Sequence, residues 1–159
     1  MSKISVDKEN IQNSYISKFN VNLIDFNVVL RFPYIGFKLF RTPKTKFCGL
    51  SNSNIDGLSI KLDPIEGLNI EYYTHIKDLG DSAWFKCGRY CGTVDKNLPI
   101  EGVGFRLSGP EKDNYSIRCF VYDNKRIKIP PYKLEKNYYG TKYQNRPLSF
   151  IRVVLIKKN

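Results

Sequence analysis

The side chains with the greatest chemical potential lie close together in the middle of this 159-residue chain. Cys87 and Cys91 are separated by three residues, the only histidine is His75, and the only tryptophan is Trp84. Thiolates and an imidazole are ligands that zinc prefers, and two nearby thiols can also form a redox pair. This stretch therefore poses a choice between a metal or redox site and ordinary structural cysteines.

The composition is that of one basic domain rich in aromatic residues. The net charge is +11, and the chain contains eleven Tyr, ten Phe and one Trp. This charge implies affinity for something anionic, or simply high solubility, and the aromatic residues favour sheet. No stretch is long and apolar enough to span a membrane, and the polar start shows no signal peptide. We therefore expect a protein that is cytoplasmic as made, or that is released or assembled by a non-classical route.

Three segments share a common pattern, which predicts an internal repeat. Each contains a glycine that precedes a run of alternating apolar residues: Gly49 before Leu58, Ile60 and Leu62; Gly92 before Val103, Phe105 and Leu107; and Gly140 before Ile151, Val153 and Leu155. A second strand-like run opens each segment. Alternation with a period of two is typical of a strand with one buried face. The repeats therefore cover residues 26–62, 68–107 and 115–155 of a single domain, preceded by an N-terminal arm, residues 1–22.

The length of the repeat points to a particular class of fold. A unit of about forty residues cannot bury its apolar face alone, but three copies around one axis can. Closure around the axis also removes exposed strand edges. We therefore expect an all-β fold in which three units repeat with pseudo-threefold symmetry. The length of the opening and closing strands favours a β-prism, with a β-trefoil as the alternative.

The middle repeat contains a further pattern of aromatic residues and glycines. It consists of Tyr72, His75-Ile76, Gly80, Trp84, Gly88, Gly92-Thr93, Ile100-Glu101 and Leu107. This pattern, over residues 72–107, resembles the clostridial hydrophobic W repeat. The sequence departs from the family at Asp81, where the family has its first tryptophan, and the other two copies match only in the closing strand and its glycine. The resemblance implies a repeat unit associated with bacterial surface proteins, glycan binding or adhesion.

The repeat register favours a structural interpretation of the cysteines. When the three repeats are aligned, Cys91 falls at the same position as Cys48 and Tyr139. Cys119 falls at the same position as Leu30 and Tyr72, so both positions carry cysteine in some repeats and apolar or aromatic residues in others. Cysteine at such positions behaves as a small buried hydrophobe. A zinc site would also need a second ligand pair, and a catalytic His75 would need a nucleophile and a partner. We therefore expect no metal, no cofactor and no enzymatic activity, and leave a Cys87–Cys91 disulfide as an alternative.

Several aromatic and acidic residues near the turn glycines form a candidate glycan site. Sugars stack on aromatic faces while carboxylates fix their hydroxyls. The candidates are Asp81, Trp84, Tyr90 and Asp95 in the second repeat, with Tyr138 and Tyr143 in the same capacity at the equivalent turn of the third repeat. The alternative for Trp84 is that it anchors the core of its own unit.

Basic residues gather in two stretches, in the first and third repeats. Residues 123–159 contain ten Lys and Arg but only two acidic residues. The candidates for contact with an anionic partner are Lys38, Arg41, Lys44, Lys46, Lys125, Arg126, Lys128 and Lys133. Lysine and arginine interleaved with tyrosine suit phosphate contact and base stacking, so nucleic acid is one candidate partner. A solvated basic surface is the alternative.

The sequence favours binding over catalysis. The leading hypothesis is a non-catalytic, lectin-like module that recognises a glycan or another anionic surface. The alternatives are a structural or assembly subunit, of a virion, inclusion or toxin complex, with protein partners or as a homo-oligomer, and a nucleic-acid-binding accessory protein.

Overall fold

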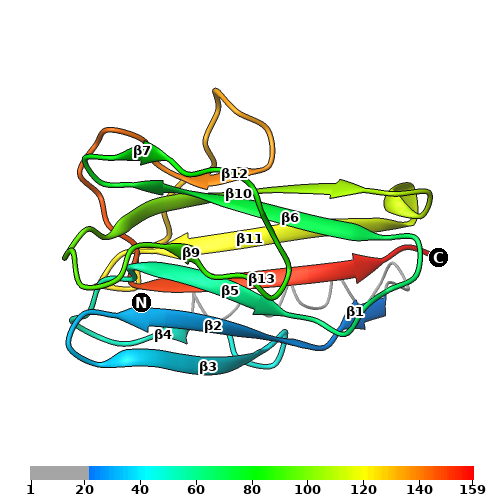
Figure 1. Cartoon of the computed structure of the whole chain (residues 1–159), viewed down its shortest axis with the longest axis horizontal. Helices are drawn as coiled ribbons and strands as arrows, with labels where there is room; N and C mark the ends of the chain where they lie inside the picture. The colour runs from blue at the N-terminus through cyan, green and yellow to red at the C-terminus, as the bar shows by residue number, and fades with distance from the viewer. Residues whose placement is uncertain (1–21) are drawn as a thin grey trace, which may run out of the picture.

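The computed structural model describes residues 22–159, which form thirteen strands and one short 3-10 helix (Figure 1). The strands are β1 (Asn22–Ile24), β2 (Phe26–Phe32), β3 (Gly36–Thr42), β4 (Cys48–Gly49), β5 (Gly57–Lys61), β6 (Asn69–Ile76), β7 (Gly80–Asp81), β8 (Phe85–Lys86), β9 (Cys91–Gly92), β10 (Ile100–Ser108), β11 (Tyr115–Tyr122), β12 (Tyr138–Gly140) and β13 (Phe150–Lys157), and the helix is η1 (Lys112–Asn114). The predicted all-β class is confirmed. Apart from Asn22, the predicted arm lies outside the described residues.

The strands form three antiparallel sheets, each named here by its two long central strands. The β2–β5 sheet has the order β3-β2-β5-β9, the β6–β10 sheet has the order β12-β10-β6-β7 with β8 also on β6, and the β11–β13 sheet has the order β1-β13-β11 with β4 also on β13. Among residues 22–159, none of these sheets closes into a barrel. Figure 1 shows the long strands of the three sheets running roughly alongside one another.

In each sheet, the two central strands are the strand-like runs that open and close one of the predicted segments. Leu58 lies opposite Leu30, Phe105 opposite Tyr72, and Val153 opposite Cys119. These side chains are buried because alternate residues of each strand face the core.

The pairing corrects one predicted alignment. Tyr72 and Cys119 face matching positions of their closing strands, Phe105 and Val153, but the equivalent residue of the first closing strand, Ile60, lies opposite Val28. The predicted match of Cys119 with Leu30 is therefore wrong by two residues. A shift of two leaves the alternation of a strand unchanged, so the hydrophobic pattern could not detect it.

Three short strands pair with a strand from a different segment of the chain and so join the sheet that this other segment forms. β9 pairs with β5, β12 with β10, and β4 with β13. Each contact requires a glycine: a Cβ on Gly92, at φ +148°, would stand 2.3 Å from the carbonyl oxygen of Asp56. Gly140 and Gly49 meet the carbonyl oxygens of Glu101 and Ser149 in the same way. The turn glycines of the predicted repeat therefore allow close backbone approach between strands that come from different segments of the chain.

A closed ring of backbone hydrogen bonds links the three segments just before their closing strands. Ile55 N–H donates to Leu148 O at 2.8 Å, Leu148 N–H to Ile100 O at 3.1 Å, and Ile100 N–H to Ile55 O at 2.8 Å. All three side chains are fully buried. Each segment is therefore tied to both of the others at one point.

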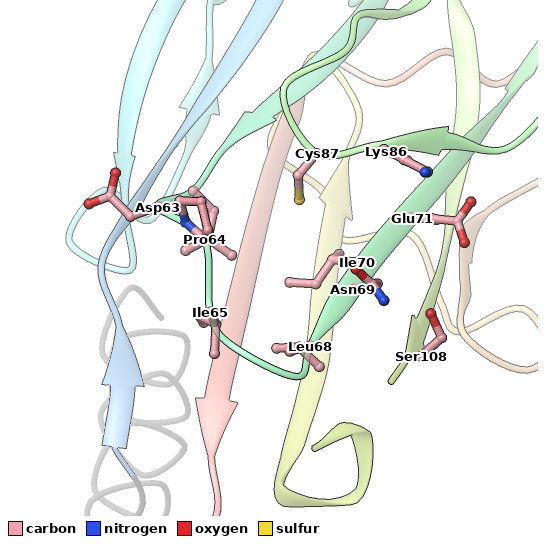
Figure 2. Close-up of a pocket in the computed structure, with 11 residues that line it drawn as sticks. Asp63, Pro64, Ile65, Leu68, Asn69, Ile70, Glu71, Lys86, Cys87 and Ser108 are labelled. Atoms are coloured by element: carbon pink, nitrogen blue, oxygen red, sulfur yellow. The ribbon is translucent and has the colours of Figure 1, made fainter. Parts of the chain in front are cut away.

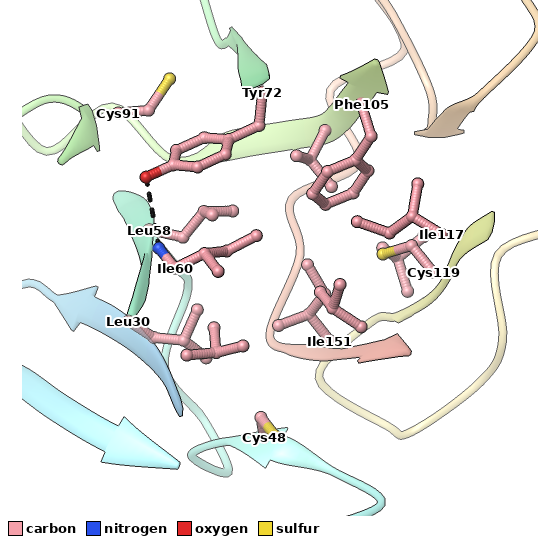
Figure 3. Packing of buried hydrophobic residues seen from close by; sticks show 14 of the residues in the cluster. Leu30, Cys48, Leu58, Ile60, Tyr72, Cys91, Phe105, Ile117, Cys119 and Ile151 are labelled. Carbon is pink, nitrogen blue, oxygen red and sulfur yellow. Dashed lines mark hydrogen bonds between the residues drawn. The ribbon is translucent and has the colours of Figure 1, made fainter. Parts of the chain in front are cut away.

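One hydrophobic core lies between the sheets and receives side chains from all of them. Figure 3 shows Leu30 and Ile60, Tyr72 and Phe105, and Ile117 pointing toward a common centre from their respective sheets. The three closing-strand leucines all contact this core: Leu155 is buried, and Leu62 and Leu107 are partly buried. The three sheets therefore share one hydrophobic core, and this shared core fixes the positions of their outer faces.

Candidate functional site

A group of aromatic and charged side chains covers the outer face of the β6–β10 sheet. We call it the β6 cluster; it consists of Tyr73, His75, Asp81, Trp84, Glu135, Tyr138, Lys142 and Tyr143. Tyr73 and His75 alternate with the core-facing Tyr72 along β6, so the strand directs both toward the outer face. Asp81 pairs with His75 across β7 and β6. With Tyr138, which lies in β12 opposite Gly104 of β10, the sheet fixes four of the eight members directly.

A chain of polar contacts runs through the centre of the cluster. The Nδ1 atom of His75, a residue only 1% exposed, lies 2.6 Å from Asp81 Oδ1. Lys142 Nζ donates to the other carboxylate oxygen of Asp81 at 3.0 Å and to Glu135 Oε2 at 2.7 Å. Tyr73 donates its hydroxyl hydrogen to the second oxygen of Glu135. Two half-exposed carboxylates are therefore held in place by one nearly buried ammonium group.

These contacts shift the ionisation of the central pair. Burial alone would raise the pKa of Asp81, but hydrogen bonds from His75 and Lys142 outweigh it and hold that pKa below its ordinary value. Burial alone would lower the pKa of Lys142, but its three hydrogen bonds raise that pKa above its ordinary value. Asp81 is therefore a fixed carboxylate at neutral pH, suited to accept hydrogen bonds rather than to deliver protons.

Aromatic rings flank the polar chain on one side. The Tyr73 ring stacks on Tyr138 at 5.8 Å between centroids and meets Trp84 edge-on at 4.7 Å. The Arg106 guanidinium lies 4.1 Å from the Trp84 ring centroid and is fixed there by two hydrogen bonds to Glu71. Trp84 remains 38% exposed. It is therefore a surface ring held in a defined orientation, and the alternative of a core anchor does not fit its position.

Tyr143 contacts the polar chain at His75, the end away from Tyr73. Its ring meets His75 edge-on at 4.7 Å between centroids, and it is 84% exposed. Its backbone, in the loop that follows β12, adopts φ +60°, which is unusual for a tyrosine. The contacts run in the order Trp84, Tyr73, Lys142, Asp81, His75 and Tyr143. A chain of contacts thus connects the fixed carboxylate of Asp81 with two exposed aromatic rings, Trp84 and Tyr143.

The structure brings together four of the six predicted glycan-site residues, Asp81, Trp84, Tyr138 and Tyr143. Tyr138 is only 2% exposed and donates its hydroxyl to the carbonyl of Thr141 at 2.8 Å, so it supports the surface from beneath. Sequence reasoning missed Tyr73, Glu135 and Lys142, and it gave His75 a structural role outside the site. The alternation of Tyr73 with core residues on β6 was a usable signal, whereas nothing in the sequence marked Lys142.

The other two predicted residues, Tyr90 and Asp95, contact a different sheet, so the prediction that they share a site with Asp81 and Trp84 is wrong. Asp95 pairs with Arg31 of β2 at 2.7 Å, and the Tyr90 ring meets Phe37 of β3 edge-on. The physical reason is the transfer of β9 to the β2–β5 sheet, because the residues on either side of β9 must follow it there.

The predicted basic residues also have specific positions. Arg126, from the turn after β11, lies 5.1 Å from the ring centroid of Phe47, which follows Lys46 in the chain. Lys128 lies over the Phe120 ring at 4.8 Å, and Arg41 is 3.9 Å from Asp25. The two basic stretches therefore meet at Phe47, although they are far apart in the sequence.

A cavity of about 450 Å³ lies where the chain passes from β5 to β6 (Figure 2). Figure 2 shows Cys87 on one side of it and Ile65 and Leu68 on another. Burial raises the pKa of Cys87 to about 11, so its thiol is protonated and weakly nucleophilic at neutral pH. The residues that line this cavity show no arrangement for covalent chemistry.

The four cysteines carry free thiols, and three of them are buried. The Sγ atom of Cys91 lies 3.1 Å from Ser82 Oγ and 3.4 Å from Thr74 Oγ1, so it takes part in a local hydrogen-bonding group beneath β7. Within residues 22–159, no three histidine, cysteine, aspartate or glutamate side chains are grouped so as to hold a metal ion. In the same range, no helix is long and apolar enough to cross a membrane.

Comparison with known proteins identifies one segment of the chain. No curated protein and no solved structure was found to match the chain. A family match covers residues 75–109, from the end of β6 through β10, and includes His75, Asp81 and Trp84 of the β6 cluster. The family is described as clostridial hydrophobic W, which confirms the resemblance seen in the sequence for this one segment of the chain.

Proposed function

We propose that this protein is a non-catalytic, lectin-like module that binds a glycan at the β6 cluster. The observation that carries the proposal is the fixed carboxylate of Asp81, which a chain of contacts links to the exposed rings of Trp84 and Tyr143. Sugar rings present apolar C–H faces and polar hydroxyls, and protein sites for them combine aromatic faces with a few convergent polar groups. The β6 cluster offers both on one surface.

The polar groups of the cluster have distinct roles in this proposal. Asp81 and Glu135 accept hydrogen bonds from sugar hydroxyls, since about half of each carboxylate is exposed. Lys142 and the buried His75 hold the acceptors in a fixed geometry, which reduces the entropy lost on binding. The lowered pKa of Asp81 favours binding over acid catalysis, because a general acid requires a raised pKa.

The same proposal includes a pseudo-threefold β-prism as the scaffold. Three features support it. Each sheet is built on the opening and the closing strand of one segment, and each short Cys-Gly or Tyr-Gly strand joins the sheet of another segment. A ring of three backbone hydrogen bonds also joins equivalent positions of the three segments. Of the two predicted architectures, the β-prism accounts better for three separate sheets around one core. The alternative is a β-trefoil, an architecture in which strands close into a barrel.

A glycan array is the first test of this function. We expect the wild-type protein to bind a defined group of glycans, and Asp81→Ala to weaken binding by about tenfold or more, because a charged acceptor contributes roughly 1.5–3 kcal/mol. Asp113→Ala is the matched control, since Asp113 is an exposed acidic residue in η1, outside the β6 cluster. An array without hits would refute the proposal, and equal binding by Asp81→Ala would refute the site.

A second candidate function is contact with a polyanion, favoured by the stacking of Arg126 on Phe47. This contact brings the turn after β11 next to the segment before β4, and both segments contain several lysine or arginine residues. Phosphate or sulfate contacts weaken as salt rises. We expect elution from heparin to require less salt for a Lys44→Gln/Lys125→Gln variant than for wild type or for Lys112→Gln. Equal elution of all three would remove this candidate.

A further inference from the structure

We propose that the chain carries a second glycan site, in a cavity of the β2–β5 sheet that is separate from the β6 cluster. One molecule would then hold two ligands on two different sheets. The class of ligand rests on the proposed function, but the site itself rests on its own residues. We call it the Arg31 cavity; among the residues that line it are Arg31, Tyr34, Ile35, Asp56, Asp95 and Asn97.

The Arg31 cavity has the size and composition of a small-molecule site. Its volume is about 390 Å³, which falls within the range of typical ligand sites, roughly 300–1,000 Å³. Arg31 is only 6% exposed, and its two terminal nitrogens bind different carboxylates, Asp56 at 2.6 Å and Asp95 at 2.7 Å. The guanidinium therefore fixes both acidic side chains and leaves the trio with one net negative charge.

Asp56 supplies the observation that indicates a ligand. The residue is 1% exposed and lines the cavity, yet its Oδ1 atom has no hydrogen-bond partner. Burial outweighs the neighbouring Arg31 and raises the pKa of this carboxyl above its ordinary value. Buried acceptors are nearly always satisfied by protein, water or ligand. A donor entering the cavity would complete the hydrogen bonding of Asp56.

The Arg31 cavity and the β6 cluster occupy matching positions on their sheets. Arg31 lies opposite Gly57 as His75 lies opposite Gly102, and each of these glycines pairs with a turn glycine. The loops that follow the turn glycines also share their unusual backbone: Asp95 has φ +57° where Tyr143 has +60°. The same scaffold position therefore carries different side chains on the two sheets.

The chemistry of the Arg31 cavity favours a neutral sugar. The net negative charge of the trio disfavours anionic ligands, whereas sugar hydroxyls can donate to Asp56 Oδ1 and to Asp95, whose side chain is 85% exposed. Asn97 adds an amide that can both donate and accept. Tyr34, which is 99% exposed, provides an aromatic face at the rim. These groups match the hydroxyls and one C–H face of a pyranose.

Two tyrosines allow each site to be removed separately. Tyr34 has φ +65° and Tyr143 has φ +60°, and both are strongly exposed. Asparagine tolerates this conformation better than tyrosine does, so Tyr34→Asn and Tyr143→Asn remove a ring without disturbing the fold. The two variants are therefore matched in chemistry and differ only in the site they affect.

The test is a two-dimensional amide NMR titration with the methyl glycosides of glucose, galactose, mannose and N-acetylglucosamine at millimolar concentrations. For at least one glycoside we expect two separate sets of shifted signals, one around Asp95 and Asn97 and one around Asp81 and Trp84. Tyr34→Asn should weaken only the first response, and Tyr143→Asn only the second, each by about tenfold.

The outcomes separate the two proposals. Shifts confined to the β6 cluster and insensitive to Tyr34→Asn would overturn the second site and leave the proposed function standing. Shifts confined to the Arg31 cavity would support the second site and refute the β6 cluster as a glycan site. The absence of any shift around Asp95 and Asn97 with all four glycosides would overturn the second site, whatever the array shows for the β6 cluster.

Discussion

Asp81 and Asp56 are both paired with cations on neighbouring sheets, yet their pKa values move in opposite directions. Asp81 is half exposed and is shared between His75 and Lys142, so its pKa is lowered. Asp56 is almost fully buried and has one oxygen without a partner, so desolvation outweighs the attraction of Arg31 and its pKa is raised. The comparison teaches that a neighbouring cation does not by itself set the direction in which the pKa of a carboxylate moves. The exposure of the carboxylate and the number of its hydrogen-bond partners decide that direction.

The largest difference between the two regions should appear when the cation is removed. Arg31→Met leaves the buried Asp56 unpaired and should lower the free energy of unfolding by about 3–5 kcal/mol. Lys142→Met leaves carboxylates that still reach water and should cost about 1 kcal/mol. Chemical denaturation measures both. Equal losses would show that the two carboxylates do not differ in their need for a cation.

The contacts that join each site to its neighbouring segment should be nearly as sensitive. A Cβ at Gly92, which supports the Arg31 cavity, or at Gly140, which supports the β6 cluster, would overlap backbone atoms of another strand. Each Gly→Ala change should cost about 3 kcal/mol, from overlap and unfavourable φ together. Gly88→Ala is the control, since Gly88 has φ +88° with open space around it and should cost only about 1–2 kcal/mol. A similar cost at all three glycines in urea unfolding would refute the close approach.

The pH dependence of stability should differ in sign between the two carboxylates. Asp81 has a folded pKa below its ordinary value of 3.8, so its stabilisation is present above pH 3.8 and is lost as pH falls through the folded pKa. Asp56 has a folded pKa above 3.8, so its ionisation destabilises the fold as pH rises from 3.8 through that pKa. Urea unfolding across the acid range, with Asp81→Asn and Asp56→Asn as references, should give opposite slopes. Slopes of the same sign would contradict the comparison.

The smallest effects on stability are expected at the two exposed tyrosines. Tyr34→Asn and Tyr143→Asn should each change the free energy of unfolding by no more than about 0.5 kcal/mol, because both rings are exposed and both backbones favour asparagine. Thermal unfolding provides the measurement. A loss well above this value in either variant would show that the ring has a structural role and would disqualify that variant as a binding probe.

The alternation of apolar residues was sufficient to predict the long strands, since Leu58, Phe105 and Val153 all face the core as expected. It could not predict that the short strands β4, β9 and β12, of two or three residues each, pair with strands of other segments, because such short pieces have no period of their own. The residues of the candidate site were recognisable by type at Asp81, Trp84 and Tyr143. Their grouping was not, since the transfer of β9 separates Asp95 from neighbours that are close in sequence.

The most direct test of the β6 cluster uses its only tryptophan as a reporter. Trp84 is the sole tryptophan of the chain, is partly exposed and lies at one end of the cluster. Titration with a glycan that binds on the array should produce a saturable change in tryptophan fluorescence that Asp81→Ala and Tyr143→Asn abolish and that Tyr34→Asn preserves. A saturable change that survives both β6-cluster variants, or binding without any change in Trp84 emission, would contradict the account.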